Sequence, residues 1–491
     1  MPKFLVIATI ICIAMVLLGI NRGFDVSDEG LYVLLAHPLQ ENQGGIFNYD
    51  LFFKLFHQIT GIHFGIVGLR ILRLFIYCLG ALALAIFYRN LKFEKQLSLE
   101  VYLISLLGLM AGYGFLPASL SYNHLSVVLA AGCLALLSTR ASKLTQNLSL
   151  GVLLGILVYV KVTTAWLLGL LTLGLMLYEK RLNWKVLLAL LIPFILLEGV
   201  FYLTLSENAI IRLSDGLSIQ TGREDYHWWT LVKHTGVGAF WSLLLFVISF
   251  LSFRLIKKKF FQALLIISAF HLTFFITHIT DEWNHFFLLF GVVIWAWFFA
   301  KSDFSRFSAK EKVWILLLLV LPFVLHFGSN VYWLRIGIHY LVFWIMAWLI
   351  LAEKARLKSL KWVNIGIAFS VLLLVFNGLW WRPFEQRELW KATENWEYLP
   401  GKNIHLSFHQ ISALEKLQTQ IGEEKVLLAA YRISGIPFLL GKTLPQSPGF
   451  WDQEQLKGFF PEGYSKDILF FPIDSLPQNF TQEPILITDF R

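Results

Sequence analysis

Two adjacent carboxylic acids follow the first apolar run of the chain. The run ends near Ile20, and Asp28 and Glu29 come a few residues later. A carboxylate in suitable surroundings can take the proton of an attacking hydroxyl group and so act as a general base. Alternatively, the two acids could lie in solvent at the N-terminus of a surface helix. Acidic residues are favourable at that end of a helix, and Ser27 or Asp28 could cap it by accepting the first backbone N–H groups. The residues alone leave both interpretations open.

Four basic residues stand close to the ends of apolar segments, where they could bind a phosphate group. Arg70 and Arg73 are three residues apart and so share one face of a helix. Lys161 interrupts a long apolar stretch, and Arg335 lies within Trp333–His339. Arginine and lysine form charge-assisted hydrogen bonds with anionic oxygens. Each of them could instead extend to lipid head groups at the membrane interface.

Metal and nucleotide motifs are missing from the sequence. No pair of histidines has the spacing of a strong zinc motif. We therefore expect no cofactor, with a divalent ion held by Asp28, Glu29 and His285 as the alternative. Asp281 and Glu282 are predicted to form a short solvated loop. There is neither a Walker A motif nor a Gly-x-Gly-x-x-Gly after a strand, which argues against a nucleotide-sugar donor or an ATP-driven enzyme.

Long apolar blocks must position these residues. Of the 491 residues, 57% are hydrophobic and 15% are charged, and a block of about twenty apolar residues can cross a bilayer. The three cysteines fall inside such blocks and are interpreted as packing residues. We predict about thirteen membrane spans, near residues 4–20, 66–88, 98–116, 124–139, 147–160, 162–178, 186–205, 237–254, 260–279, 285–300, 313–329, 338–352 and 362–380.

The net charge of +9 is spread over basic clusters between the apolar blocks. Such clusters are typical of cytoplasmic loops and do not favour nucleic-acid binding. Two short spans broken at Lys161 keep every cluster on one side, whereas one long span over 147–178 does not. We therefore predict a cytoplasmic N-terminus and an external turn at Lys161. The clusters are Arg89/Lys92/Lys95, Arg140/Lys143, Lys180/Arg181/Lys185, Arg254/Lys257/Lys258/Lys259, Lys301/Arg306/Lys310/Lys312 and Lys354/Arg356/Lys358/Lys361.

Three segments fall on the opposite side, namely the loops 21–65 and 206–236 and everything after Trp381. In the first loop, Asp28–His37 and Tyr49–Thr60 are predicted helices that lie in the membrane interface. Residues 382–491 are more polar and form a predicted small α/β domain. Its expected strands are Val426–Tyr431, Asp467–Phe471 and Ile485–Thr488, and its expected helices are Ile404–Ile421 and Ile433–Leu440. The fold class is therefore an all-α polytopic membrane domain, 1–381, with an extracytoplasmic α/β domain.

The first external loop resembles that of the GT-C superfamily of lipid-linked glycosyltransferases. More narrowly, it looks like the branch that contains the protein O-mannosyltransferases and the aminoarabinose transferases of lipid A. Those proteins carry an acidic pair just after the first span, and Asp28-Glu29-x-x-Tyr32 is similar to it. The segment from Gly61 to Arg70 looks like their glycine–arginine segment before the second span.

Further along, Gly151–Lys161 resembles the glycine-rich hairpin with a lysine in the same branch. Two places depart from the family pattern. Phe47–Asp50 lacks the Lys-Pro of the aminoarabinose enzymes, and Ser121–His124 stands where many relatives have an Asp. The sugar, the carrier and the phosphate ligands therefore stay open. Further candidates for contact with donor or acceptor are Tyr32, Tyr49, Asp50 and His124.

The resemblance implies a GT-C-like enzyme of the bacterial inner membrane. Such enzymes transfer a sugar from a polyprenyl-phosphate donor to a lipid, glycan or protein hydroxyl outside the cytoplasm, with inversion. It implies Asp28 as the base, with Glu29 orienting it or sharing the site. Cations must also stabilise the leaving phosphate, and the candidates are Arg70, Arg73, Lys161 and Arg335. The alternatives are a transporter or flippase, which the absence of an internal repeat does not favour, and a subunit that keeps only the fold.

Overall fold

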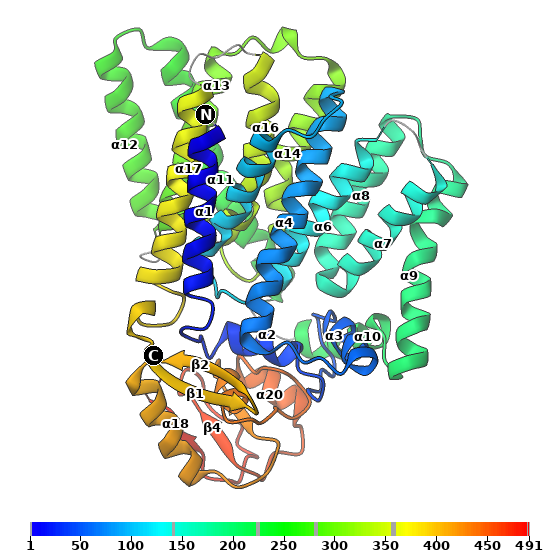
Figure 1. Cartoon of the computed structure of the whole chain (residues 1–491), viewed down its shortest axis with the longest axis vertical. Helices are drawn as coiled ribbons and strands as arrows, with labels where there is room; N and C mark the ends of the chain where they lie inside the picture. Colours follow the sequence, from blue (N-terminus) through cyan, green and yellow to red (C-terminus); the bar gives the residue numbers. More distant parts are fainter. Residues whose placement is uncertain are drawn as a thin grey trace.

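The computed structural model of the chain describes residues 2–139, 143–221, 226–278, 283–354, 360–488 and 490. It consists of a bundle of helices with a small α/β domain at one end (Figure 1). The N-terminus lies toward the opposite end of the bundle, so the chain starts and finishes on different sides of it (Figure 1).

The chain is a multi-pass membrane protein. Seven helical segments in the described part are long and apolar enough to cross a membrane, five shorter ones are also apolar, and α14 matches the remaining predicted span. The seven are α4 (Gly65–Lys92), α9 (Trp184–Leu205), α11 (Trp228–Leu255), α12 (Lys259–Thr277), α13 (Trp283–Lys301), the run from α15 (Trp333–Ile336) through η4 (Gly337–Tyr340) to α16 (Leu341–Lys354), and α17 (Leu360–Val375) with η5 (Phe376–Trp381). The others are α1 (Pro2–Leu18), α5 (Leu99–Met110) with η1 (Ala111–Gly114), α6 (Tyr122–Leu137), α7 (Leu144–Val160), α8 (Val162–Tyr178) and α14 (Ala309–His326).

The predicted break at Lys161 is present. Helix α7 ends at Val160 and α8 begins at Val162, with Lys161 in an extended conformation between them. Its ammonium donates to the carbonyls of Leu325 at 2.7 Å and His326 at 3.1 Å, at the end of α14. A helix C-terminus carries unpaired carbonyls and partial negative charge, which a buried ammonium satisfies. The two short spans are therefore confirmed.

The basic clusters gather at the end of the bundle away from the α/β domain. Arg181 donates to the carbonyl of Leu137, and the ammonium of Lys310 lies 2.6 Å from the carboxylate of Glu179. These contacts join the ends of α6, α8 and α14. The residues Arg140, Arg356 and Lys358 of the predicted clusters lie outside the described residues.

Three short helices lie across the other end of the bundle, between it and the α/β domain (Figure 1). They are α2 (Asp28–Leu35), α3 (Asp50–Thr60) and α10 (Ala209–Thr221). The first two confirm the predicted helices of the first loop. The predicted cap of α2 was wrong, because neither Ser27 nor Asp28 caps it. Instead Asp25 accepts the N–H groups of Ser27 and Glu29, both at 3.0 Å.

The C-terminal domain is α/β, as predicted. Strands β3 (Leu428–Ala430), β4 (Ile468–Phe470) and β5 (Ile485–Leu486) form a parallel sheet in that order, with helices α18 (Phe408–Gln420), α19 (Gly435–Leu439) and α20 (Gln453–Phe459) around it. The hairpin of β1 (Glu394–Leu399) and β2 (Lys402–Leu406) was not predicted. The predicted helix at 404–421 begins only at Phe408, because residues 404–406 belong to β2 and pair with β1.

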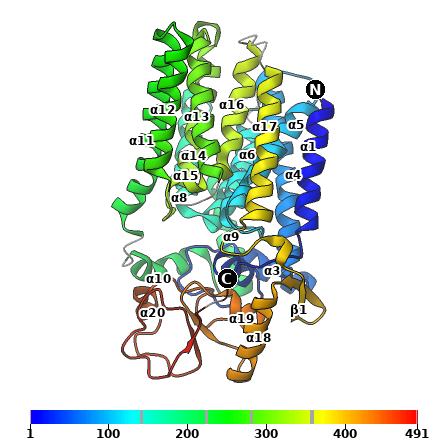
Figure 2. The same ribbon diagram turned by 90° about the vertical axis from the view of Figure 1, so that its left-hand side faces the viewer.

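The C-terminal domain packs directly on α2. The N–H of Gly435 donates to the carbonyl of Val26 at 2.7 Å, and the hydroxyl of Ser434 donates to the carbonyl of Ser27 at 3.1 Å. A Cβ on Gly30 would lie 2.2 Å from the nitrogen of Gly435, so only glycine allows this approach. Helix α10 lies next to α20 of the same domain (Figure 2). The first loop is thus held between the membrane helices and the C-terminal domain.

The position of the basic clusters predicts the orientation of the chain. Since cytoplasmic loops are rich in Lys and Arg, the C-terminal domain should face away from the cytoplasm. A membrane-impermeant maleimide should label Phe408→Cys, an exposed position in α18, in intact cells. Lys95→Cys, after α4, should react only once the membrane is permeabilised. The reverse pattern would invert the topology.

Candidate functional site

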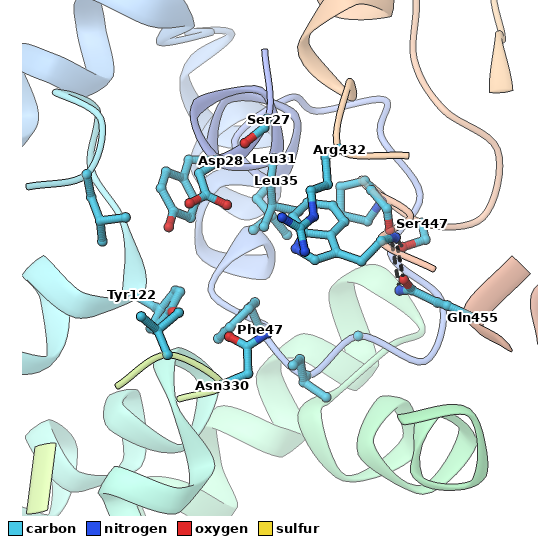
Figure 3. Close-up of a pocket in the computed structure, with 18 of the residues that line it drawn as sticks. Ser27, Asp28, Leu31, Leu35, Phe47, Tyr122, Asn330, Arg432, Ser447 and Gln455 are labelled. Carbon is cyan, nitrogen blue, oxygen red and sulfur yellow. Dashed lines mark hydrogen bonds between the residues drawn. The ribbon is translucent and has the colours of Figure 1, made fainter. Parts of the chain in front are cut away.

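A cavity of about 210 Å³ lies where the first loop, the membrane helices and the C-terminal domain meet. Asp28 projects into it from the start of α2, and Arg432 reaches it from the C-terminal domain (Figure 3). Successive residues of a helix point about 100° apart, so Asp28 faces the cavity while Glu29 faces the bundle. The other side chains of the wall used below are Tyr32, Phe47, Phe115, Tyr122, Asn330, Arg335, Glu385, Ser447, Trp451 and Gln455.

The surroundings of Asp28 suit a general base. Burial raises the pKa of its carboxyl to about 6, the neighbouring positive charge of Arg432 opposes the rise, Glu385 adds to it, and Arg335 opposes it. Asp25, on the same loop, is a further acid near Asp28. A carboxylate with a pKa just below neutrality is ionised in the cell yet more basic than an exposed one, which favours proton abstraction.

Glu29 is held in a buried ion pair and is not among the residues that line the cavity. Its two carboxylate oxygens accept Nε and Nη2 of Arg70, both at 2.8 Å, and the hydroxyl of Ser119 donates to it at 2.5 Å. Glu29 is fully buried, and the Arg70 side chain is 3% exposed. This bidentate pair joins α2 to α4 and sets the direction in which Asp28 points.

Arg70 was predicted to bind the donor phosphate, but its guanidinium is committed elsewhere. Besides Glu29, it donates to the carbonyls of Ile20 at 3.0 Å, Arg22 at 2.8 Å and Gly23 at 2.7 Å. All of its nitrogens are therefore used to hold the turn between α1 and α2. Arg70 is not among the residues that line the cavity, so none of its N–H groups points into it.

Arg73 and His124 lie inside the bundle, away from the cavity. Arg73 is fully buried, donates to the carbonyl of Pro117 at 2.8 Å and lies 3.7 Å above the ring of Tyr113. His124 is also fully buried, and its Nδ1 accepts the N–H of Ser121 at the start of α6. Both residues serve the packing of α4 and α6 in this structure.

Of Lys161, Tyr32 and Tyr49, only Tyr32 lines the cavity. The Lys161 ammonium is 5.8 Å from the ring centroid of Tyr122, which lines the cavity. Tyr32 lines the cavity directly, edge-on to the ring of Tyr122. Tyr49 is almost fully buried. Lys161 and Tyr49 therefore support the wall from outside, and only Tyr32 reaches its surface.

Asp50 belongs to a buried ion-pair network. Its carboxylate oxygens lie 2.7 and 2.8 Å from Nη1 of Arg212, and the side chains of Asn42 and Lys54 also contact it. Because Arg212 is in α10, the ion pair joins α3 to α10. This position suits a structural role.

Arg335 is the one predicted phosphate ligand that lines the cavity. Its guanidinium lies 5.0 Å from the ring centroid of Phe115 on the membrane side, and its charge acts on Asp28. Arg432 and Glu385, on the other hand, were not predicted. Both have backbone φ in the left-handed region, at 54° and 53°, and residues held in such unfavourable conformations cluster at functional sites.

Arg432 had one weak signal in the sequence. It comes two residues after the buried strand β3, and ligands of parallel sheets bind beyond the carboxyl ends of the strands. Nothing in the sequence placed that end opposite Asp28. The pairing depends on the close contact between α2 and α19.

The residues of the alternative metal site do not come together. Within the described ranges, no group of three or more His, Cys, Asp or Glu residues could hold a metal ion. The oxygens of Glu29 are bound to Arg70, and the Nε2 of His285 lies 2.7 Å from the hydroxyl of Thr277 between α12 and α13. The predicted loop at Asp281 and Glu282 lies outside the described residues.

No protein-family model and no curated protein matches the sequence. Among solved structures, the chain is similar to ArnT from Cupriavidus metallidurans, which was crystallised bound to undecaprenyl phosphate. The two chains are 11% identical with a TM-score of 0.40, over 94% of this chain and 88% of ArnT. A score of this size assigns neither a family nor a function, so the proposal below rests on the cavity itself.

The different roles of the two adjacent acids predict opposite effects on stability. Glu29→Gln should destabilise the protein by about 3–5 kcal/mol, because it leaves Arg70 buried without its counter-charge. Asp28→Asn should leave stability at neutral pH unchanged or higher. The folded state raises the pKa of Asp28, so ionisation of this acid costs stability as the pH rises from 3.8 through about 6, and Asn removes that cost.

Thermal unfolding of the purified variants at pH 7.5 measures both effects. Glu388→Gln is the matched control, because Glu388 pairs with Lys391 on the surface and such pairs contribute about 1 kcal/mol at most. A melting temperature of Glu29→Gln equal to that of the control would contradict the structural role of the pair.

Proposed function

We propose that this protein transfers a sugar from a polyprenyl-phosphate carrier to an acceptor hydroxyl, outside the cytoplasm, with Asp28 as general base. The observation that carries the proposal is Asp28 itself: a half-buried carboxyl with a pKa near 6, in a cavity at the end of the membrane helices, with Arg335 and Arg432 beside it. The similarity of Asp28-Glu29-x-x-Tyr32 to the acidic motif of GT-C enzymes agrees with it.

The reaction needs one proton acceptor and one stabilised leaving group. The acceptor hydroxyl gives its proton to Asp28 while its oxygen forms a bond with the anomeric carbon. The bond from that carbon to the phosphate oxygen breaks, and the carrier leaves as a polyprenyl phosphate. Guanidinium groups stabilise the charge that grows on the phosphate oxygens. We assign this role to Arg335, assisted by Arg432.

The wall of the cavity matches a lipid-linked substrate. On the membrane side, apolar side chains line it together with Asp28, Asn330 and Arg335, whereas the side of the C-terminal domain carries Arg432, other polar groups and a tryptophan. A hydrocarbon chain is favoured against the first side because burial removes apolar surface from water. The apolar side chains are Leu31, Leu35, Phe47, Phe115, Leu116, Val331, Ile336 and Phe384.

The cavity lies at one end of the bundle. Transporters more often bind their substrate near the middle of the membrane, at discontinuous helices. Within the bundle, large side chains such as Trp314 and Trp333 are fully buried. This packing gives no support to the transporter alternative.

Asp28→Asn should abolish transfer without unfolding the protein. Loss of a general base typically lowers the rate about 10²- to 10⁴-fold. The donor is first identified by mass spectrometry of polyprenyl-phosphate sugars that copurify with the protein. Release of polyprenyl phosphate from that donor, with membrane extract as acceptor, then measures transfer. Asp303→Asn, at an exposed position after α13, is the control. If Asp28→Asn transferred sugar at the rate of the control, the assignment of Asp28 as the base would be contradicted.

The pH dependence should follow the charges around Asp28. Since only the carboxylate accepts a proton, kcat/KM should rise as the pH passes through about 6. Arg432→Gln removes a positive charge that favours the carboxylate, so its midpoint should move to higher pH. Glu385→Gln removes a negative charge that opposes it, so its midpoint should move to lower pH. Midpoints that stay in place, or move in the same direction, would show that Asp28 does not control the profile.

A further inference from the structure

The C-terminal wall of the cavity carries a partly buried aromatic side chain with no assigned role. Trp451 lines the cavity and lies on the loop Ser447–Trp451, just before α20. Its indole is the large flat surface of this wall. The proposed transfer reaction does not use it.

The loop that carries Trp451 is held rigidly by its own hydrogen bonds. The hydroxyl of Ser447 donates to the carbonyl of Gly449 at 3.1 Å. The side chain of Gln455 accepts the N–H of Trp451 at 2.9 Å and donates to the carbonyl of Gly449 at 3.4 Å (Figure 3). A Cβ on Gly449 would lie 2.2 Å from the indole, so the ring packs directly against this glycine. A ring fixed in this way loses little conformational entropy when it binds a ligand.

Trp451 and Arg432 both lie beyond the carboxyl edge of the parallel sheet. Ala430, the last residue of β3, forms a parallel bridge with Phe450, and the N–H of Arg432 donates to the carbonyl of Phe450 at 3.1 Å. The two residues therefore follow neighbouring parallel segments. In parallel sheets, the carboxyl edge is where ligands bind.

This wall is also fixed to the first loop. The carbonyl of Gln446 accepts the N–H of Gln43 at 2.8 Å, and the amide of Gln40 both donates to and accepts from the backbone of Leu444, each at 2.9 Å. Trp451 is thus held at a set position relative to Asp28. The two face one cavity although they come from different domains.

We propose that Trp451 is the stacking platform of an acceptor subsite and that the acceptor is a saccharide. This rests on the proposed function. In an inverting transfer, the acceptor oxygen approaches the anomeric carbon opposite the leaving phosphate. If the carrier lies against the apolar membrane side, the acceptor comes from the C-terminal side. A sugar ring has an apolar C–H face that packs on an indole, and hydroxyl groups that bond to polar neighbours.

Saturation-transfer NMR with methyl glucoside, methyl galactoside and methyl mannoside tests the subsite on the full-length protein in nanodiscs. The wild-type protein should transfer saturation to the ring protons of at least one glycoside. Trp451→Ala should weaken binding at least about fivefold, and Trp451→Phe less. Gly449→Val, which displaces the ring, should also weaken binding. Trp390→Ala, at an exposed tryptophan outside the cavity, should bind as the wild type does.

A second arm separates this subsite from the donor sugar and from the proposed function. Asp28→Asn should bind the glycosides normally, also when saturated with polyprenyl-phosphate glucose. If that donor displaced the glycosides, Trp451 would bind the sugar of the donor and not the acceptor, which would overturn the proposal. Wild-type binding by Trp451→Ala, or no saturation transfer to the wild-type protein, would overturn it as well. Loss of transfer activity in Asp28→Asn tests the base alone, so the two proposals can fail separately.

Discussion

The buried pair of Glu29 and Arg70 is the interaction on which the candidate site depends. It joins a short loop helix to the long helix α4, and the same guanidinium holds three carbonyls of the turn after α1. An ion pair out of water is maintained only when nearly every donor and acceptor is satisfied. Here that condition is met, so α2 has one orientation and Asp28 faces one direction.

Because the pair takes up the charge of Glu29, the two adjacent acids have different chemistry. Glu29 is a buried anchor paired with Arg70, whereas Asp28 lies at the edge of a cavity where burial raises its pKa. Arg432 and Arg335 keep that rise moderate. The balance yields a carboxylate that is charged at neutral pH yet a better base than a solvated one.

The cavity belongs to neither domain alone. The membrane domain supplies the acid, one arginine and the apolar side, and the C-terminal domain supplies Arg432 and the rigid loop with Trp451. The contact of Gly30 with Gly435 brings the two together at backbone distance. The C-terminal domain is thus part of the site, and its removal would take away one wall and one cation.

The sequence by itself determined the apolar spans, the break at Lys161 and the two loop helices, because these depend on local composition and periodicity. It could not assign Glu29 and Arg70 to each other, since the pair joins residues 41 positions apart. Nor could it find Arg432, Glu385 or Trp451, which reach the cavity only through packing of the C-terminal domain. The tertiary structure decided which cations face Asp28, because charge–charge interactions depend on distance and burial, and neither quantity is encoded in residue spacing.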